Sequence, residues 1–226
     1  HFKAGLPHAA TVKSLATSFD IDTPTDLAVL HLVSSGAPFA QTVGPSLRAF
    51  LGGVPGALPA LAKNVERAYA VMATRRAQVF VAGRVSSWTW RRMEINLPSQ
   101  TRIVSEERGM RASGRETRGE VHSLLGMFAN VAGVKGLIQA LETSSDVAFL
   151  DTRVLFAHMG LSPGRAERFA SDALVAQEIA DPWIRDLTQA AGNASMPIVM
   201  GGHSLIAGGV WALSEAVRER VVDLRS

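Results

Sequence analysis

Apolar residues that recur every three or four positions indicate helices along much of this chain. The first helix signal lies at Thr23, a residue type that caps helices, because Pro24 and Asp26 follow it at favoured first-turn positions. The same spacing predicts a longer helix from near Ala57 to Arg76. The N-terminal part of the chain is therefore expected to be mainly helical.

The C-terminal half carries the more regular helical pattern. A residue that favours a helix start precedes most of its apolar runs, and the expected helices begin near Val121, Ser145, Ser162, Asp181 and Ser204. The helix after Ser145 is expected to end before Gly160, and the last helix to run to the end of the chain.

In the middle of the chain the spacing of the apolar residues changes. Between Val79 and Val104 the apolar Trp88, Trp90 and Ile95 alternate with polar residues, which predicts a strand or hairpin. The following segment, 106–120, is charged, contains several glycines and has no apolar period. It is predicted to be a mobile loop or linker.

These patterns predict a mainly α fold with a small β-hairpin element. We expect a multi-helix globular body, with an N-terminal helical lobe at 1–107 that holds the β element and a C-terminal helical lobe at 108–226, or one continuous domain. The 226 residues suffice to bury a large core.

Composition narrows the classes of function. The chain is 47% hydrophobic and only 19% charged, which predicts apolar surface buried between subunits and therefore a homo-oligomer. The absence of cysteine excludes thiolate chemistry and disulfides. Two uncharged stretches, 27–47 and 187–214, are interrupted by glycine, proline and polar residues, so no membrane span is expected.

The motif that comes nearest to a catalytic signature is Gly202-His203-Ser204-Leu205-Ile206. It is similar to the nucleophile elbow of α/β-hydrolases, but Ile206 stands where a glycine is needed, and no histidine follows Ser204. Ser204 is therefore interpreted as a helix N-cap. The histidines lack metal-ligand spacing and the glycines lack phosphate-loop spacing, so no metal, cofactor or catalytic residue is predicted.

Arginine is concentrated in one part of the chain. The 44 residues from 75 to 118 hold ten arginines and no lysine, against four glutamates. Arginine favours bidentate contacts to phosphate, and Trp88 and Trp90 in the same window can stack on bases. A solvated charged region with core tryptophans is the competing interpretation.

The leading hypothesis is a self-assembling, non-enzymatic, nucleic-acid-binding protein of the nucleocapsid or coat type, cytoplasmic or in a virion, that coats RNA or single-stranded DNA. Its expected contact residues are Arg75, Arg76, Arg84, Arg91, Arg92, Arg108, Arg111, Arg115, Arg118, Trp88 and Trp90. The alternatives are a hydrolase-like small-molecule enzyme with a site assembled near His203 and Ser204, with His158 as a further participant, and a helical scaffold protein.

Overall fold

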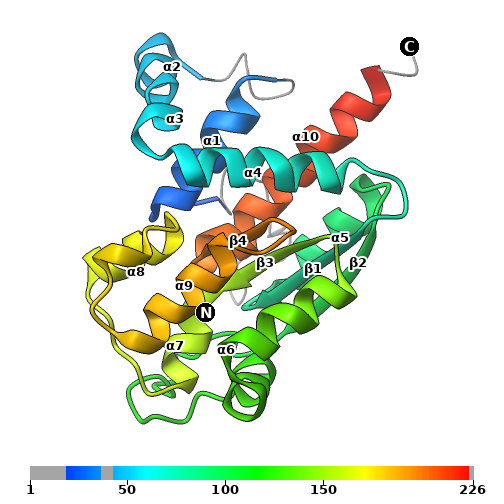
Figure 1. The fold of residues 1–226 in the computed structure, drawn as a ribbon. Helices are drawn as coiled ribbons and strands as arrows, with labels where there is room; N and C mark the ends of the chain where they lie inside the picture. Colours follow the sequence, from blue (N-terminus) through cyan, green and yellow to red (C-terminus); the bar gives the residue numbers. More distant parts are fainter. Residues whose placement is uncertain (1–18, 37–42, 224–226) are drawn as a thin grey trace, which may run out of the picture.

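The structure is a computed structural model that describes residues 19–36 and 43–223. Within them, four strands form one fully parallel sheet in the order β2-β1-β3-β4 (Figure 1). The strands are β1 (Gln78–Gly83), β2 (Gln100–Ser105), β3 (Val147–Asp151) and β4 (Ile198–Gly201). The protein therefore has an α/β fold.

Three of the four strands, β1, β3 and the edge strand β4, are buried on both faces. β3 and β4 are buried at every position, and β1 at most of its positions. A strand between two helical layers needs apolar residues on both sides, so it reads as a short continuous apolar run. β2 lies at the edge of the sheet and is largely exposed.

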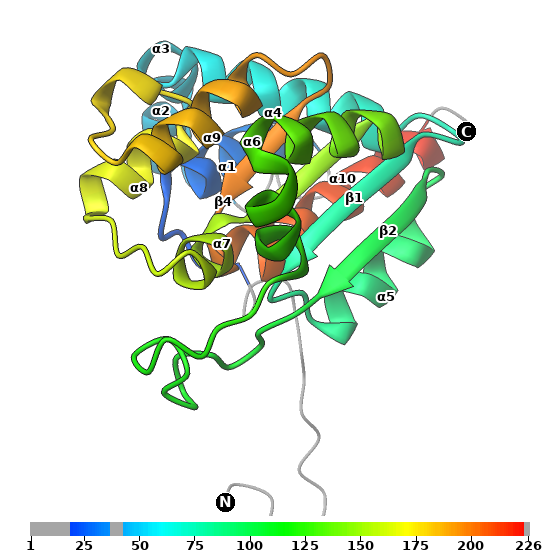
Figure 2. The ribbon, with the colours of Figure 1, turned by 60° about the horizontal axis from the view of Figure 1, so that its bottom comes forward.

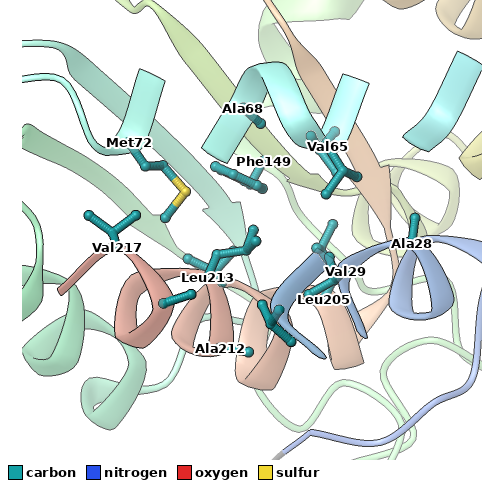
Figure 3. Close-up of a cluster of buried hydrophobic side chains, with 14 of the residues drawn as sticks. Ala28, Val29, Val65, Ala68, Met72, Phe149, Leu205, Ala212, Leu213 and Val217 are labelled. Atoms are coloured by element: carbon teal, nitrogen blue, oxygen red, sulfur yellow. The ribbon is translucent and has the colours of Figure 1, made fainter. Parts of the chain in front are cut away.

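Helices cover both faces of the sheet. One face carries α1 (Pro24–Ser34), α4 (Pro59–Met72), α5 (Ser87–Asn96) and α10 (Val210–Asp223). In Figure 3, apolar side chains of α1, α4 and α10 lie around Phe149 of β3. The short helices α2 (Pro45–Gly52) and α3 (Val54–Ala57) pack beside α1 and α4. This layer forms the larger of the two cores.

The opposite face carries the helices that follow β2 and β3. They are α6 (Leu124–Ser144), α7 (Thr152–His158), α8 (Arg165–Asp172) and α9 (Pro182–Gly192), with a short 3-10 turn, η2 (Ala176–Glu178), between the last two. Their apolar side chains pack on Ala148 and Leu150 of β3 and on Met200 of β4. In Figure 2, α6 and α9 lie in front of the sheet, and α5 and α10 lie behind it.

The predicted mainly α fold with a small β-hairpin is wrong. The expected hairpin at 79–104 is β1, α5 and β2, in which β1 and β2 pair in parallel. The expected helix after Ser145 is β3 followed by α7. The error has a physical cause, because a doubly covered strand of four to six apolar residues has no period that separates it from one face of a buried helix.

Several predicted helix starts are confirmed. Thr23 and Asp26 form a reciprocal capping box at the start of α1, and Asp181 accepts a hydrogen bond from the backbone N–H of Ile184 at the start of α9. The last helix begins near Ser204 and passes through a π-helical turn, η3 (Leu205–Gly209), into α10. Ser204, however, makes no capping hydrogen bond.

The segment 106–120 is a compact run of turns. Backbone hydrogen bonds join its residues to one another, and Met110 is buried against Val121 and Val154 of α7. β1 and β2 precede this segment and β3 and β4 follow it, yet all four strands belong to one sheet. The division of the chain at 107/108 stays a prediction.

One helix in the described part of the chain, α6, is long and apolar enough to cross a membrane by length and composition. It is kinked at Gly133, where the backbone is left-handed, and Leu137, Ile138 and Leu141 pack in the core of the second face. The length and apolar composition of α6 are those of a core helix as much as of a membrane span.

Candidate anion-binding site at the carboxyl edge of the sheet

The connections that leave the carboxyl ends of β1 and β3 run in opposite directions. β1 connects through α5 to β2, at one edge of the sheet, whereas β3 connects through α7, α8 and α9 to β4, at the other. Such a topological switch opens a crevice at the carboxyl ends of the strands, where ligands of α/β proteins commonly bind. The residues that follow these strands are therefore the first candidates for a site.

Arg84, directly after β1, is locked to Asp151 at the end of β3. Its Nε and Nη2 donate to the two carboxylate oxygens at 2.6 and 3.0 Å, and the Asp151 side chain is fully buried. Gly83 makes this approach possible, because a Cβ there would lie 2.2 Å from the Cβ of Asp151. The guanidinium is held in one position at the end of the sheet.

A second buried arginine comes from α7. Arg153 donates from Nη1 and Nη2 to the two oxygens of Asp172 at 3.0 and 2.5 Å, and also from Nη1 to the hydroxyl of Thr152. Burial raises the pKa of Asp172 to about 7, although the Arg153 charge opposes this rise. Each of the two arginines is thus fixed by a bidentate carboxylate partner.

The two arginines line a cavity of about 650 Å³, which we call the sheet-edge pocket. The residues just before α1, together with α7, α8, the segment 106–120 and the loops after β1 and β4, contribute to its wall. Its lining residues are Ile21, Asp22, Thr23, Arg84, Arg111, Arg153, Arg165, Arg168, Phe169, Gly202, His203 and Ser204. The lining holds five arginines and one aspartate; Asp151, Asp172 and Glu116 pair with three of the arginines, so Arg165 and Arg168 supply the excess positive charge.

The electrostatic field of these arginines acts on their neighbours. Burial and the positive charges of Arg153, Arg111 and Arg165 lower the pKa of Arg168. Shielding from water and then the Arg84 guanidinium lower the pKa of His203, which is therefore neutral near pH 7. Mutual repulsion of this kind indicates that the cationic groups converge on one space.

Ser204 belongs to a buried polar cluster beneath the pocket. Its hydroxyl donates to Oδ2 of Asp26 at 2.6 Å, and the hydroxyl and backbone N–H of Thr23 donate to the same oxygen. Burial raises the pKa of Asp26. The cluster joins the start of α1 to the turn after β4, so it fixes two walls of the sheet-edge pocket.

The predicted nucleic-acid contact residues lie in separate places. Arg75 and Arg76 are exposed between α4 and the amino end of β1, at the edge of the sheet opposite the pocket. Arg91 and Trp90 are exposed on α5, which covers the far face from α6. Only Arg84 and Arg111 of the predicted set line the sheet-edge pocket.

Most of the other predicted contact residues are paired with side chains of this chain. Arg92 lies over the rings of Trp88 and Trp211. The ion pairs within the 106–120 segment join Arg111 to Glu116, Arg115 to Glu107 and Arg118 to Glu120, and Arg108 is exposed beside them. The arrangement does not unite the predicted arginines in one groove, so nucleic-acid binding stays a prediction without a shared surface.

The histidines do not assemble a catalytic group. His158 accepts a hydrogen bond from the backbone N–H of Ser123 and contacts Asn130 of α6, whereas His203 lines the sheet-edge pocket. Among the described residues, no group of three or more histidine, aspartate or glutamate side chains lies close enough to hold a metal ion.

Sequence reasoning missed the pocket residues of the C-terminal half, Arg153, Arg165 and Arg168. A signal for them exists in the sequence, because apolar runs that end in Gly83-Arg84, Asp151 and Gly201-Gly202 mark the carboxyl ends of buried strands. No protein-family model, curated protein or solved structure shows significant similarity to this chain.

Proposed function

We propose that this chain binds a small molecule that carries a phosphate or diphosphate group in the sheet-edge pocket. The observation that carries the proposal is the convergence of five arginines from four parts of the chain on one cavity at the carboxyl edge of a parallel sheet. Cavities of this size hold small molecules and cofactors.

The number and placement of the cations favour phosphate over a single carboxylate. Arg84 and Arg153 are already paired with buried aspartates, and Arg165 and Arg168 add positive charge from α8. A phosphate presents oxygens in several directions and carries up to two charges, so it matches donors that approach from different elements. A lone carboxylate presents two oxygens in one plane and one charge, so it matches fewer of these donors.

The helix that begins at His203 adds to the positive electrostatic potential in the sheet-edge pocket. Its first turn follows Gly202, which lines the pocket, and the positive end of a helix dipole favours an anion. A Cβ at Gly202 would make only ordinary contacts, the nearest at 3.8 Å from Thr23.

The test is calorimetric titration of the full chain with inorganic pyrophosphate at low salt. We expect binding, and Arg168→Gln should weaken it about 10-fold to 100-fold, because a hydrogen bond to a charged group contributes about 1.5–3 kcal/mol. Arg165→Gln should weaken it in the same direction through the loss of a rim charge.

Arg75→Gln is the matched control, because it removes one positive charge at the opposite edge of the sheet. It should leave pyrophosphate binding unchanged. Equal losses from Arg75→Gln and Arg168→Gln would contradict the proposal, as would tighter binding of citrate than of pyrophosphate.

The same variants separate this proposal from nucleic-acid coating. Titration with a single-stranded oligonucleotide should show no dependence on Arg75 or Arg91 if the sheet-edge pocket is the anion site. Tight oligonucleotide binding that Arg75→Gln and Arg91→Gln abolish, with no pyrophosphate binding, would favour the nucleic-acid hypothesis instead.

A further inference from the structure

A second cavity adjoins the sheet-edge pocket. It has a volume of about 310 Å³ and lies between α7 and the 106–120 segment, and we call it the loop pocket. Three arginines, Arg111, Arg153 and Arg168, line both cavities. Their guanidinium groups therefore stand at the boundary between the two spaces.

The two cavities differ in chemistry away from this boundary. Away from the arginines, the loop pocket is lined by Phe156 and Leu161, by the hydroxyl residues Thr117 and Ser162, and by Glu116, which is paired with Arg111. Arg153 lies over the ring of Phe156, with its Cζ 5.9 Å from the ring centroid, which ties the aromatic wall to the shared cations. Apolar side chains together with hydroxyl groups and a carboxylate suit an uncharged, hydroxyl-bearing organic moiety rather than a second anion.

The position of the charge constrains the shape of the ligand. A phosphate at the end of a molecule would leave one of the two cavities without an occupant, whereas an anionic group in the middle places one moiety in each. The guanidinium groups of the three shared arginines donate in part to Asp172, Glu116 and the carbonyl oxygen of Pro163, and their remaining N–H groups can meet the oxygens of a diphosphate.

We propose that the sheet-edge pocket and the loop pocket form one cleft for a ligand in which a diphosphate joins two organic moieties, with the diphosphate at Arg111, Arg153 and Arg168. This inference rests on the proposed function, since it requires that the shared arginines bind phosphate. It adds the class of ligand: a nucleoside diphosphate esterified at its far end, rather than a simple phosphate ester.

The experiment compares four probes by calorimetry on the full chain: pyrophosphate, ADP, ADP-ribose and UDP-glucose. At least one of the last two, which carry a moiety on each side of the diphosphate, should bind 10-fold or more tightly than ADP. Ser162→Trp, which places a large side chain at the loop pocket, should remove that gain and leave pyrophosphate binding unchanged. Gln139→Trp, at an exposed position of α6 outside both cavities, should change neither.

The outcomes separate the two proposals. If pyrophosphate does not bind, the proposed function fails and takes this inference with it. If pyrophosphate binds but neither two-moiety probe exceeds ADP by 10-fold, or if Ser162→Trp leaves their advantage intact, the single-cleft inference is overturned while the phosphate site stands.

Discussion

Gly83→Ala tests the junction that fixes Arg84 at the sheet edge. Gly83 has a φ of +125°, and a methyl group there would lie 2.2 Å from the Cβ of Asp151, which is far inside van der Waals contact. The backbone conformation costs an alanine about 1–3 kcal/mol. The overlap with a buried side chain adds about 1–3 kcal/mol more, because β1 and β3 are paired and Asp151 has no room to withdraw.

The expected loss for Gly83→Ala is therefore about 2–6 kcal/mol of unfolding free energy. Gly109→Ala is the matched control, since Gly109 also has a positive φ, +79°, but a Cβ there meets nothing within 4 Å. It should cost only about 1–2 kcal/mol, which is the penalty for left-handed backbone.

Urea unfolding followed by circular dichroism measures both variants against the unsubstituted chain. Both glycines have a positive φ, so the difference between the two losses reports mainly the contact with Asp151. Equal losses, or a smaller loss for Gly83→Ala, would refute the close approach of β1 and β3 at this junction.

Three further predictions concern the groups around the pocket. Because burial raises the pKa of Asp172 to about 7, from 3.8, folding takes up a proton between these values, and the free energy of unfolding should fall as pH rises from about 4 to 7. Asp172→Asn should remove that part of the fall in urea titrations at several pH values, and identical slopes in both proteins would contradict the assignment. In NMR titrations the pKa of His203 should lie below 6.5 in the free chain and rise when sulfate is added, since a bound anion favours the charged ring; an unchanged pKa would place the anion elsewhere. Met110→Ala should cost about 2–5 kcal/mol and speed proteolytic cleavage within 106–120, because Met110 is the buried side chain that anchors this segment; unchanged cleavage would show that other contacts hold it.

Sequence reasoning located helix starts where a local hydrogen bond decides them. The capping box of Thr23 and Asp26 and the cap at Asp181 depend on residues within three positions, so they can be predicted from the sequence. The strands were missed because their identity depends on distant partners. β4 contacts α1 across 175 positions of the sequence, and nothing within the short apolar runs Val147–Asp151 and Ile198–Gly201 separates a buried strand from one face of a buried helix.

Only part of the candidate site could be predicted from the sequence, because its residues come together only in the fold. Arg84 and Arg111 belong to the conspicuous arginine window, but Arg153, Arg165 and Arg168 lie outside it and join them only through the sheet topology. Density of charge along the sequence is therefore a poor guide to density of charge in space. Within the window, glutamates of the same segment pair with Arg115 and Arg118.

The most direct test of the central claim is a crystal structure of the chain with pyrophosphate. We expect phosphate density in the sheet-edge pocket, within hydrogen-bond distance of the guanidinium groups of Arg153 and Arg168. Well-occupied density at Arg75, Arg91 or any other site, with the sheet-edge pocket empty, would contradict it.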